Sequence, residues 1–565
     1  MKSLSIVSRL AALALAGLVT VPSLAQQQLR YEDPKPLTQT MSNLRLRPLQ
    51  ADAEKQMFVI TWAGDVATKL AAEDNMFGNG MVLTLENDPR KQAEAIINGK
   101  TPYFRGTMGM FNAVLPAIQQ AGGDMVIIVQ LTWSNGGDLM IARESIRTPA
   151  DLKGQDLALQ IWGPHMDFAS TILTNSGLTP SDVRFRWFRE LTIPKKDEGA
   201  IIDPVSAFRS DSSIEAVMVI SPDGMILTSG GKVGTGTDDS VKGARIAATS
   251  KATNRVIADI IAVRKDYFEA NRGKVEEVVR TILRSQEALA ELQKATDARS
   301  QQRYKTLLTK AAGMLLDAPQ ATADIEGMIL DAEFVGHPGN LQFFTGQGTN
   351  RTCETLTREI QSSFVSLGLI ERPVAVAKAT WDFNSLARGL KNVTAVKSTV
   401  DAAKVAAKVE TAIKSDVKGY IEDDTLFEKA VLFVPNQMDF DSAKYQAEFA
   451  DALNLVDTNQ GAIIVVEGHM DNSKFNSLKS SGTAEAELQA MRQAAKNQSL
   501  QRANALRTRF LEYAANKGIV VDPNRIVAVG LGVDAPKHQN PGDNAQQKSE
   551  NRRAVFRIRQ MSIEE

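Results

Sequence analysis

Apolar, strand-like runs alternate with helix-like stretches near the start of the chain. Strands are expected at residues 57–62, 81–85 and 125–130, and helices fill the intervals between them. One of these helices begins with Asp88 and Pro89, a favourable N-cap and first helical residue. Because strands that alternate with helices pair largely in parallel, this pattern predicts an α/β fold with much parallel pairing.

The length and composition of the chain limit its class. A chain of 565 residues is long enough for two to four domains. Its hydrophobic content of 43% and its charged content of 23% are ordinary for a soluble globular protein. The formal net charge of −1 gives no bulk attraction for nucleic acid, so no nucleic-acid partner is expected.

The N-terminus has the features of a signal peptide over residues 1–25. Lys2 and Arg9 supply positive charge, residues 10–21 are apolar, and small residues precede Gln26. The apolar stretch is short for a membrane span, and no later run approaches the ~20 apolar residues that a span needs. We therefore expect an exported mature chain without a transmembrane segment.

Cysteine and histidine are scarce. The chain has a single cysteine, Cys353, so an intramolecular disulfide is impossible and an inert, partly buried thiol is expected. The four histidines show no local spacing typical of metal ligands. No metal site and no cofactor are therefore predicted.

Three motifs occur in order near the C-terminus. The apolar run at residues 462–466 predicts a buried strand, which continues through Gly-His-Met-Asp-Asn at 468–472. After an insert, Asn-Gln-Ser-Leu-Gln-Arg-Ala at 497–503 is expected to start a helix. Glu-Asn-Arg-Arg-Ala-Val at 550–555 leads into a last strand.

This order resembles the OmpA-like peptidoglycan-binding domain over roughly residues 423–560. The family pattern is a strand with Gly-His-Thr-Asp-Asn, a helix with Asn-x-x-Leu-Ser-x-x-Arg-Ala, and Asn-Arg-Arg-Val. The resemblance implies an α/β sandwich that binds the diaminopimelate stem peptide of peptidoglycan. It assigns Asp471 to the ligand's ammonium and Arg502 to a ligand carboxylate. The expected supporting contacts come from Asn472, Asn497 and the backbone near Asp439 and Phe440.

The sequence departs from this family pattern in three places. Met470 replaces the family's threonine, its glycine after the asparagine is missing, and residues 473–496 form a longer Ser-, Ala- and Glu-rich insert. The insert could alter peptidoglycan affinity. His469 is expected to be a structural hydrogen-bonding residue, whereas Arg552 and Arg553 either orient the site or lie on the surface of the last strand.

A second set of motifs occurs earlier in the chain. Ser-Ile-Arg-Thr-Pro-Ala-Asp-Leu-Lys-Gly-Gln spans residues 145–155, between strands expected at 136–142 and 157–160. Trp-Gly-Pro-His at 162–165 then opens a helix, and Gly-Leu-Thr-Pro-Ser-Asp-Val follows at 177–183.

This second set resembles periplasmic substrate-binding proteins of the taurine, nitrate and thiamine-precursor type, over about residues 57–390. The resemblance implies a two-lobed, type II domain that captures a small molecule in an interlobe cleft and can deliver it to an inner-membrane permease. Ligands of such folds lie at strand ends and helix N-termini. The loops expected there supply the predicted ligand-binding residues: Trp62, Asp65, Thr107, Met108, Thr132, Trp133, Ser134, Trp162, His165, Ser221 and Asp223.

The residues of these loops leave two ligand classes open. Tryptophan rings together with the carboxylates of Asp65, Asp138 and Asp223 suit a cationic or heteroaromatic ligand. The hydroxyls of Thr107 and Thr132, with exposed helix N-termini, would instead suit an oxyanion such as phosphate or a sulfonate.

The expected domain order follows from these two resemblances. An extended leader at 26–52 precedes the two-lobed domain at 53–390, and a helical linker at 391–422 precedes the OmpA-like domain at 423–565. A linker helix packed on the substrate-binding domain is an equally good interpretation.

The function predicted from the sequence is an exported solute-binding protein, tethered non-covalently to peptidoglycan in the periplasm. The alternative is a cell-wall-bound scaffold whose binding-protein fold serves protein partners. An enzyme is not expected, because no Ser-His-Asp pattern, metal-ligand cluster or phosphate loop occurs. The enzymatic branch of the resembling family carries a Cys-rich motif, whereas Cys353 stands alone.

Overall fold

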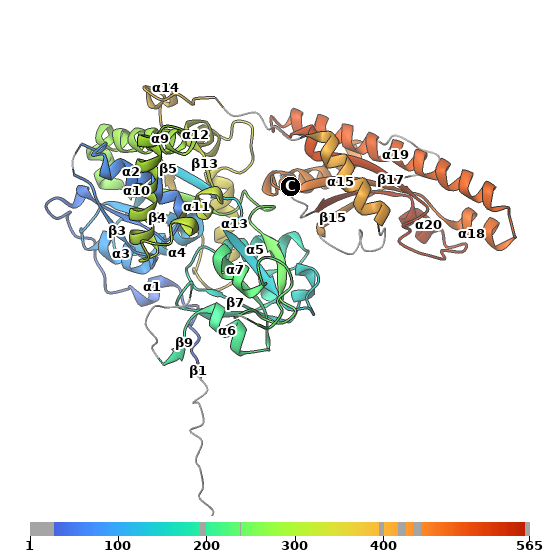
Figure 1. Cartoon of the computed structure of the whole chain (residues 1–565), viewed down its shortest axis with the longest axis horizontal. Coiled ribbons are helices and arrows are strands. Elements are labelled where there is room, and N and C mark those ends of the chain that lie inside the picture. The colour runs from blue at the N-terminus through green and yellow to red at the C-terminus, as the bar shows by residue number, and fades with distance from the viewer. Residues whose placement is uncertain are drawn as a thin grey trace, which may run out of the picture.

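The structure, a computed structural model, describes residues 28–78, 80–192, 199–237, 239–394, 401–415, 425–433, 440 and 442–559. The expected signal peptide at 1–25 lies outside these ranges. Figure 1 shows a larger unit of two lobes, coloured blue to yellow, and a smaller C-terminal unit in orange and red. Among the described residues, no helix combines the length and apolar character that a membrane crossing requires.

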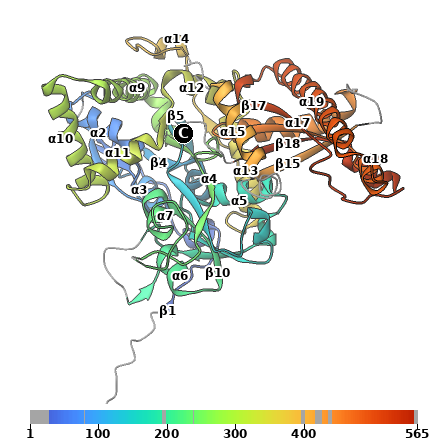
Figure 2. The ribbon, with the colours of Figure 1, turned by 45° about the vertical axis from the view of Figure 1, so that its right-hand side comes forward.

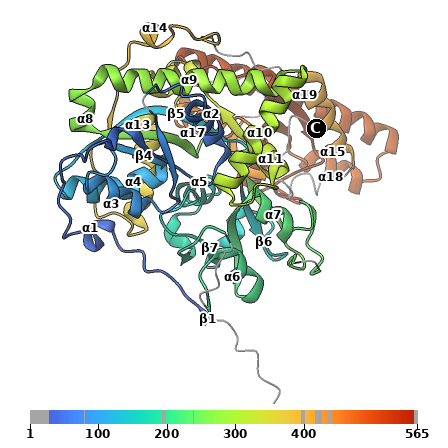
Figure 3. The same cartoon turned by 60° about the vertical axis from the view of Figure 1, so that its left-hand side comes forward.

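Lobe 1 is built on a mixed sheet covered by helices. Its strands lie in the order β13 (Ala332–Phe334), β5 (Met125–Ser134), β12 (Ala258–Arg264) and β4 (Tyr103–Thr107). A parallel pair, β2 (Gln56–Val59) and β3 (Val82–Leu85), lies beside β4. Helices α4 (Met108–Gln120), α9 (Arg272–Lys294) and α13 (Cys353–Ser366) bury apolar faces against this lobe. Figure 3 shows α9 lying across it.

Lobe 2 has a five-stranded sheet. Its order is β11 (Arg245–Thr249), β6 (Asp138–Ala142), β10 (Ile214–Ile220), β7 (Asp156–Gln160) and β8 (Arg184–Phe188). Helix α5 (Met166–Asn175) packs on the side of lobe 1, where its apolar residues join the core of that lobe. Helices α6 (Pro204–Ser210) and α7 (Ser221–Leu227) complete the lobe.

Two crossovers connect the lobes and lie side by side. Residues 135–137 lead from β5 into β6, and residues 250–257 lead from β11 back into β12. The Ser250 hydroxyl accepts a hydrogen bond from the backbone N–H of Gly136 at 3.0 Å, so the crossovers are joined directly. The two lobes are thus joined through two short segments that lie side by side.

The expectation of much parallel pairing is only partly correct. Parallel pairs occur where expected, as β2 with β3 and β7 with β8. Both main sheets are nevertheless mixed, because β6 and β12 start at the lobe boundary where their neighbours end. Strands β6 and β12 are the first strands after each crossover, so they run away from the lobe boundary and lie antiparallel to neighbours that run toward it.

The predicted elements lie near their expected positions. Helix α3 (Pro89–Ile97) begins as predicted, and its N-cap Asp88 accepts a hydrogen bond from the backbone N–H of Arg90 at 2.9 Å. Strand β5, however, continues to Ser134. Residues 132–134 were expected in a loop and instead form the end of a fully buried strand.

The segment 26–52 is not an extended leader in its described part. Strand β1 (Gln28–Leu29) pairs with β9 (Ala200–Ile201) of lobe 2. Helix α1 (Leu37–Thr40) packs against α4 of lobe 1, where Leu37 is buried in the core. This N-terminal strap therefore contacts both lobes, because its few apolar residues find separate apolar surfaces on each.

The C-terminal unit is a four-stranded sheet between helical layers. The strand order is β15 (Thr425–Leu432), β18 (Arg553–Arg559), β16 (Ile463–His469) and β17 (Ile526–Gly532). Only β16 and β17 pair in parallel. Helices α17 (Gln446–Thr458) and α19 (Glu485–Asn516) cover one face of this sheet.

The other face of this sheet is covered by the segment that was expected to be a linker. Helix α15 (Ala402–Ser415) buries Val405 and Val409 against Ile463 and Val465 of β16. The prediction of a spacer is therefore wrong, and so is packing on the substrate-binding domain. The reason lies in β16, whose uninterrupted apolar run is buried on both faces and requires a cover on each.

The helix expected to start at residue 497 begins earlier. Helix α19 starts at Glu485, and α18 (Ser473–Ser480) precedes it, so the insert is largely helical. The Glu485–Lys496 part continues the motif helix because no proline or glycine interrupts it.

The C-terminal unit lies beside the two-lobed unit (Figure 2) and contacts the second crossover. The Thr253 hydroxyl donates to the side-chain oxygen of Asn459 at 2.6 Å, and the backbone N–H of Gly461 donates to the side chain of Asn254 at 3.0 Å. Ala252 is buried within the core of the C-terminal unit. The segment that joins the two lobes is therefore also the docking surface for the third body of the molecule.

Candidate functional site

Lobe 1 contributes a buried ion network at the lobe boundary. The Arg105 guanidinium donates to Asp65 and to Asp259, each at 2.7 Å, and all three side chains are buried. Burial raises the pKa of Asp259 to about 6, although the positive charge of Arg105 opposes the rise. Asp65 was predicted to face a ligand, but it serves this network and also accepts a backbone hydrogen bond from Ile60.

Two further predicted residues are joined to this network. The Trp62 indole N–H donates to the Thr132 hydroxyl at 3.1 Å, and that hydroxyl donates to Asp259 at 3.0 Å. Both side chains are buried, at 8% and 0% exposure. Because the Thr132 hydroxyl already donates its proton to Asp259, it is not free to donate a hydrogen bond to an oxyanion.

Lobe 2 contributes a second network around β6. The Ser134 hydroxyl donates to one oxygen of Asp138 at 2.5 Å, and the other oxygen lies 2.7 Å from His165 Nε2. The hydroxyl of Ser250, on the second crossover, bonds to Ser134 at 2.8 Å. The structure thus brings Ser134 and His165 together with Asp138 at the hinge.

Several predicted residues are placed elsewhere or serve the backbone. Trp133 points away from Thr132, since side chains alternate along a strand, and it packs on Phe343 beneath Arg255. Thr107 caps α4 by accepting from the backbone N–H of Met110, and Met108 is fully buried in the core of lobe 1. Each of these side chains thus has a structural role, and their prediction as ligand contacts stays a prediction.

The start of α5 carries polar groups that the fold leaves unused. Trp162 has a left-handed backbone, with φ of 55°, a strained conformation for such a residue. Its indole N–H and the Nδ1 of His165 lack hydrogen-bond partners among the described residues, and both side chains are buried. Asp167, the second residue of α5, is a buried acidic residue that the sequence analysis did not single out.

Asp223 and Ser221 mark the start of α7 on the same lobe. The Ser221 hydroxyl donates to Asp331 of lobe 1 at 3.0 Å, which forms a direct bridge between the lobes. Burial raises the pKa of Asp223 to about 6, with a further contribution from the charge of Asp203. One Asp223 oxygen is buried without a partner among the described residues.

A signal for the missed acidic residues was present in the sequence. Asp259 is the lone acidic residue in the apolar strand of residues 258–263, and Asp167 stands in an apolar helix start. A lone acidic residue at an otherwise buried position indicates a paired or functional charge.

The C-terminal unit forms a separate polar cluster at the end of β16. The backbone oxygen of Ser499 would lie 1.9 Å from a Cβ at Gly468, so only glycine lets α19 approach this closely. One turn later Arg502 reaches Met470, with its Nη1 3.0 Å from the sulfur. An Arg552 nitrogen lies 3.7 Å from Asp471.

The two predicted ligand-binding residues therefore occupy one cluster with Arg552. Burial lowers the pKa of Arg502, and the neighbouring positive charge of Arg552 lowers it further. The guanidinium of Arg502 also lies over the Phe433 ring, 5.4 Å from its centroid. The cluster holds one carboxylate and two guanidinium groups, an arrangement that can pair with a zwitterion.

The supporting residues of this cluster have structural partners. Asn472 donates to the Gln539 carbonyl at 2.7 Å and accepts from Asn551 at 3.1 Å, which fixes the loop beside Asp471. Asn497 lies in the interior of α19, exposed, and accepts from Gln493 of the same helix. Its expected place at a helix start is therefore wrong.

The remaining predictions at this site can be placed in part. Phe440 packs on the rings of Phe433 and Phe449, while Asp439 lies outside the described residues. The buried His469 bonds through Nδ1 with the Ala535 carbonyl at 2.9 Å, as expected of a structural residue.

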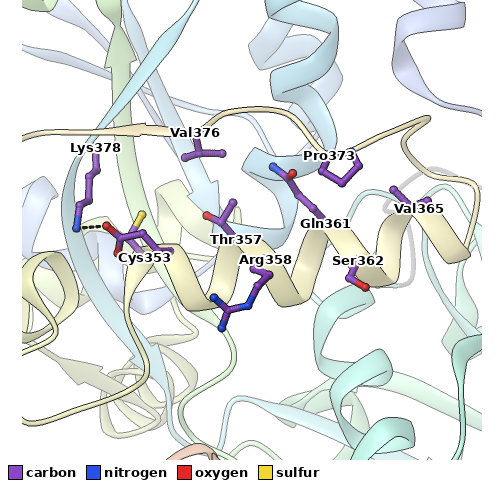
Figure 4. Close-up of a pocket in the computed structure, with 10 residues that line it drawn as sticks. Cys353, Thr357, Arg358, Gln361, Ser362, Val365, Pro373, Val376 and Lys378 are labelled. Carbon is purple, nitrogen blue, oxygen red and sulfur yellow. Dashed lines mark ion pairs between the residues drawn. The ribbon is translucent and has the colours of Figure 1, made fainter. Parts of the chain in front are cut away.

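A pocket of about 510 Å³ lies within lobe 1, between α13 and residues 373–378 (Figure 4). Cys353, Thr357, Gln361 and Val376 are among the residues that line it, and an ion pair between Lys378 and Glu354 lies at one end. Burial raises the pKa of the Cys353 thiol to about 12, so the thiol stays protonated. This pocket involves only one lobe and is separate from the boundary described above.

Comparisons with known proteins found similarity among solved structures only. The periplasmic aliphatic sulphonate binding protein SsuA from Escherichia coli has 15% identity and a TM-score of 0.39, over 61% of this chain and 98% of that one. The periplasmic nitrate-binding protein NrtA from Synechocystis PCC 6803 has 12% identity and a TM-score of 0.33, over 47% and 69%. The desulfurization enzyme DSZB has 15% identity and a TM-score of 0.36, over 59% and 99%. No protein-family model and no curated protein sequence matches the chain.

Proposed function

We propose that the chain is an exported solute-binding protein that captures a small molecule between its two lobes. In this proposal it acts in the periplasm, is tethered non-covalently to peptidoglycan through its C-terminal unit, and delivers its ligand to an inner-membrane permease. The binding domain includes the N-terminal strap as well as residues 53–390, and the peptidoglycan-binding domain includes α15.

The topology of the two lobes supports capture of a small molecule. Within the described residues, 135–137 and 250–257 pass directly from one main sheet to the other, and the lobes can open about this pair of crossovers. The N-terminal strap also contacts both lobes. Helix starts from both lobes meet at the boundary, at Met108 of α4 and Met166 of α5. Such a junction is where α/β folds place ligands.

One observation carries the proposal of peptidoglycan binding: Asp471, Arg502 and Arg552 form one cluster from three separate segments. The diaminopimelate stem presents an ammonium and carboxylates on one residue. A carboxylate beside two guanidinium groups complements both charges, and arginine can bind a carboxylate in bidentate fashion.

Co-sedimentation with purified peptidoglycan sacculi tests this tether. The mature protein is expected to pellet with the sacculi, and Asp471→Ala and Arg502→Ala are each expected to lower the bound fraction at least tenfold. Arg509→Ala, on the exposed side of the same helix, and Asp543→Ala, at a fully exposed carboxylate, are the matched controls. If the wild type stays in the supernatant, or the controls lose binding equally, the tether is wrong.

A scaffold that binds protein partners is the second candidate function. It is favoured by the burial of Thr132 and Ser134, because hydroxyls that already donate within the fold are less able to meet a ligand. Native mass spectrometry separates the two candidates. A co-purified small molecule supports capture, whereas a protein partner recovered without any small molecule supports the scaffold.

A further inference from the structure

Three groups at the lobe boundary that would suit an oxyanion, Arg105, Thr132 and Ser134, are occupied. The charge of Arg105 is balanced by Asp65 and Asp259. The hydroxyl protons of Thr132 and Ser134 are donated to carboxylates, at 3.0 and 2.5 Å. An incoming phosphate or sulfonate would therefore have to break bonds within the protein before it could bind Arg105, Thr132 or Ser134.

Asp167 is the group that the fold leaves available. It is 2% exposed, and no side chain of the described residues donates to either of its oxygens. The carboxylate lies against α4 of lobe 1, because a Cβ at Gly109 would be only 2.5 Å from Asp167 Oδ1. A buried carboxylate without a partner is costly, since it has lost its water without gaining a counter-ion.

His165 adds a second acceptor at the same helix start. Its Nε2 faces an Asp138 oxygen at 2.7 Å, which places the imidazole proton there when the ring is neutral. Nδ1 then presents a lone pair without a partner among the described residues. Two buried donors at the lobe boundary, Arg105 Nη2 and the Trp162 indole N–H, also lack partners among the described residues.

Space beside Asp167 is limited to one small group. A cavity of about 10 Å³ lies between α5 and α13, lined among others by Asp167, Thr171, Arg351 and Glu359. That volume accommodates about one water-sized group. Arg351 is paired with Glu359 at 2.8 Å, so the charges around the cavity sum to −1 when Asp167 is ionised.

We infer that the interlobe site takes a cationic ligand, specifically the ammonium group of a primary amine that also carries a neutral polar group. Asp167 binds the ammonium, with His165 Nδ1 as a further acceptor. This inference rests on the proposed capture of a small molecule between the lobes and names its chemical class. It also resolves the choice between cation and oxyanion that the sequence left open.

Ethanolamine and isethionate form the matched probe pair, since they share a hydroxyethyl group and differ in carrying an ammonium or a sulfonate. Ethanolamine is expected to raise the melting temperature of the full mature chain and to change its tryptophan fluorescence, and isethionate to do neither. Asp167→Asn should weaken ethanolamine binding roughly 10- to 100-fold, the value of one charged hydrogen bond. The exposed Asp33→Asn is the control, and His165→Gln, which removes the second proposed acceptor, replaces Asp167→Asn if that variant does not fold.

Stabilisation by isethionate but not by ethanolamine would overturn the inference while leaving small-molecule capture intact. If neither probe binds, native mass spectrometry of the purified protein decides. A co-purified cation that Asp167→Asn releases upholds the inference for a larger amine, and a co-purified anion or neutral molecule overturns it. If no small molecule is found, both the inference and the proposed capture fail.

Discussion

At the scale of single residues, the molecule is governed by which polar groups the fold has already paired. Thr132, Ser134 and Asp65 are the types of residue that contact ligands, and each was predicted from its place near a strand end. Their bonds within the protein could not be predicted, because the partners Asp259 and Asp138 lie on other strands. The type of a residue can be read from the sequence. Whether its polar atoms already have hydrogen-bond partners depends on residues that are distant along the chain.

Asp167 gives a prediction about stability and pH. Burial raises its pKa to about 7, the charge of Asp138 adds to the rise and that of Arg351 opposes it. The folded protein therefore keeps a proton on this carboxyl at pH values where the unfolded chain, with the ordinary value of 3.8, has released it. The resulting stability is fully present below pH 4 and is lost as the pH rises to about 7.

Urea denaturation at several pH values measures this effect. Between pH 4 and pH 8 the wild type should lose roughly 3–4 kcal/mol more unfolding free energy than Asp167→Asn, at about 1.4 kcal/mol per pKa unit. The variant should therefore be the more stable protein at pH 8. A wild type and variant with parallel pH profiles would show that the carboxylate is solvated or paired in the folded state.

At the scale of elements, the sequence predicts those helix and strand boundaries that depend on residues only a few positions apart. The cap at Asp88 predicts the start of α3 because the capping bond forms within three residues. The cover of β16 was missed because α15 lies about fifty residues earlier in the chain and docks through only two buried valines. The N-terminal strap was missed for the same reason, since Leu37 finds its partners on α4.

Helix α15 should stabilise the C-terminal unit, and Val409→Asp tests this. The variant places a carboxylate on a fully buried position against Ile463 and Val465, at a cost of at least about 3 kcal/mol for an unpaired buried charge. Ala407→Asp adds the same charge to the exposed side of the same helix and should change stability by less than about 0.5 kcal/mol. Equal thermal unfolding of the two variants would mean that α15 is a linker after all.

At the scale of the whole molecule, the C-terminal unit contacts one of the two segments that join the lobes. Gly461 is central to this contact, because a Cβ there would lie 1.7 Å from the Lys251 carbonyl oxygen. Residues 250–257 connect the lobes and also carry the docking bonds of Thr253 and Asn254. A tether at the cell wall would therefore act directly on the hinge.

Gly461→Ala should separate the C-terminal unit from the lobes without unfolding either. The added methyl group cannot fit against backbone atoms, so small-angle scattering should show a larger radius of gyration. Gly327→Ala, where a Cβ meets nothing within 4 Å, is the control and should leave the radius unchanged. An unchanged radius for Gly461→Ala would indicate that the docked arrangement is not held by this contact.

The sequence by itself determined the local elements, the two-unit order of the chain and the residue types of both clusters, because periodicity, capping and turn chemistry act over a few residues. Tertiary structure alone decided which face Trp133 presents, which helix covers β16, and which carboxylate at the lobe boundary lacks a partner. These three features depend on the packing of segments that are far apart in the chain. The buried Arg105, for example, pairs with both Asp65 and Asp259, which lie on other elements. The inferred preference for a cation over an oxyanion therefore rests on the fold, although every residue involved was visible in the sequence.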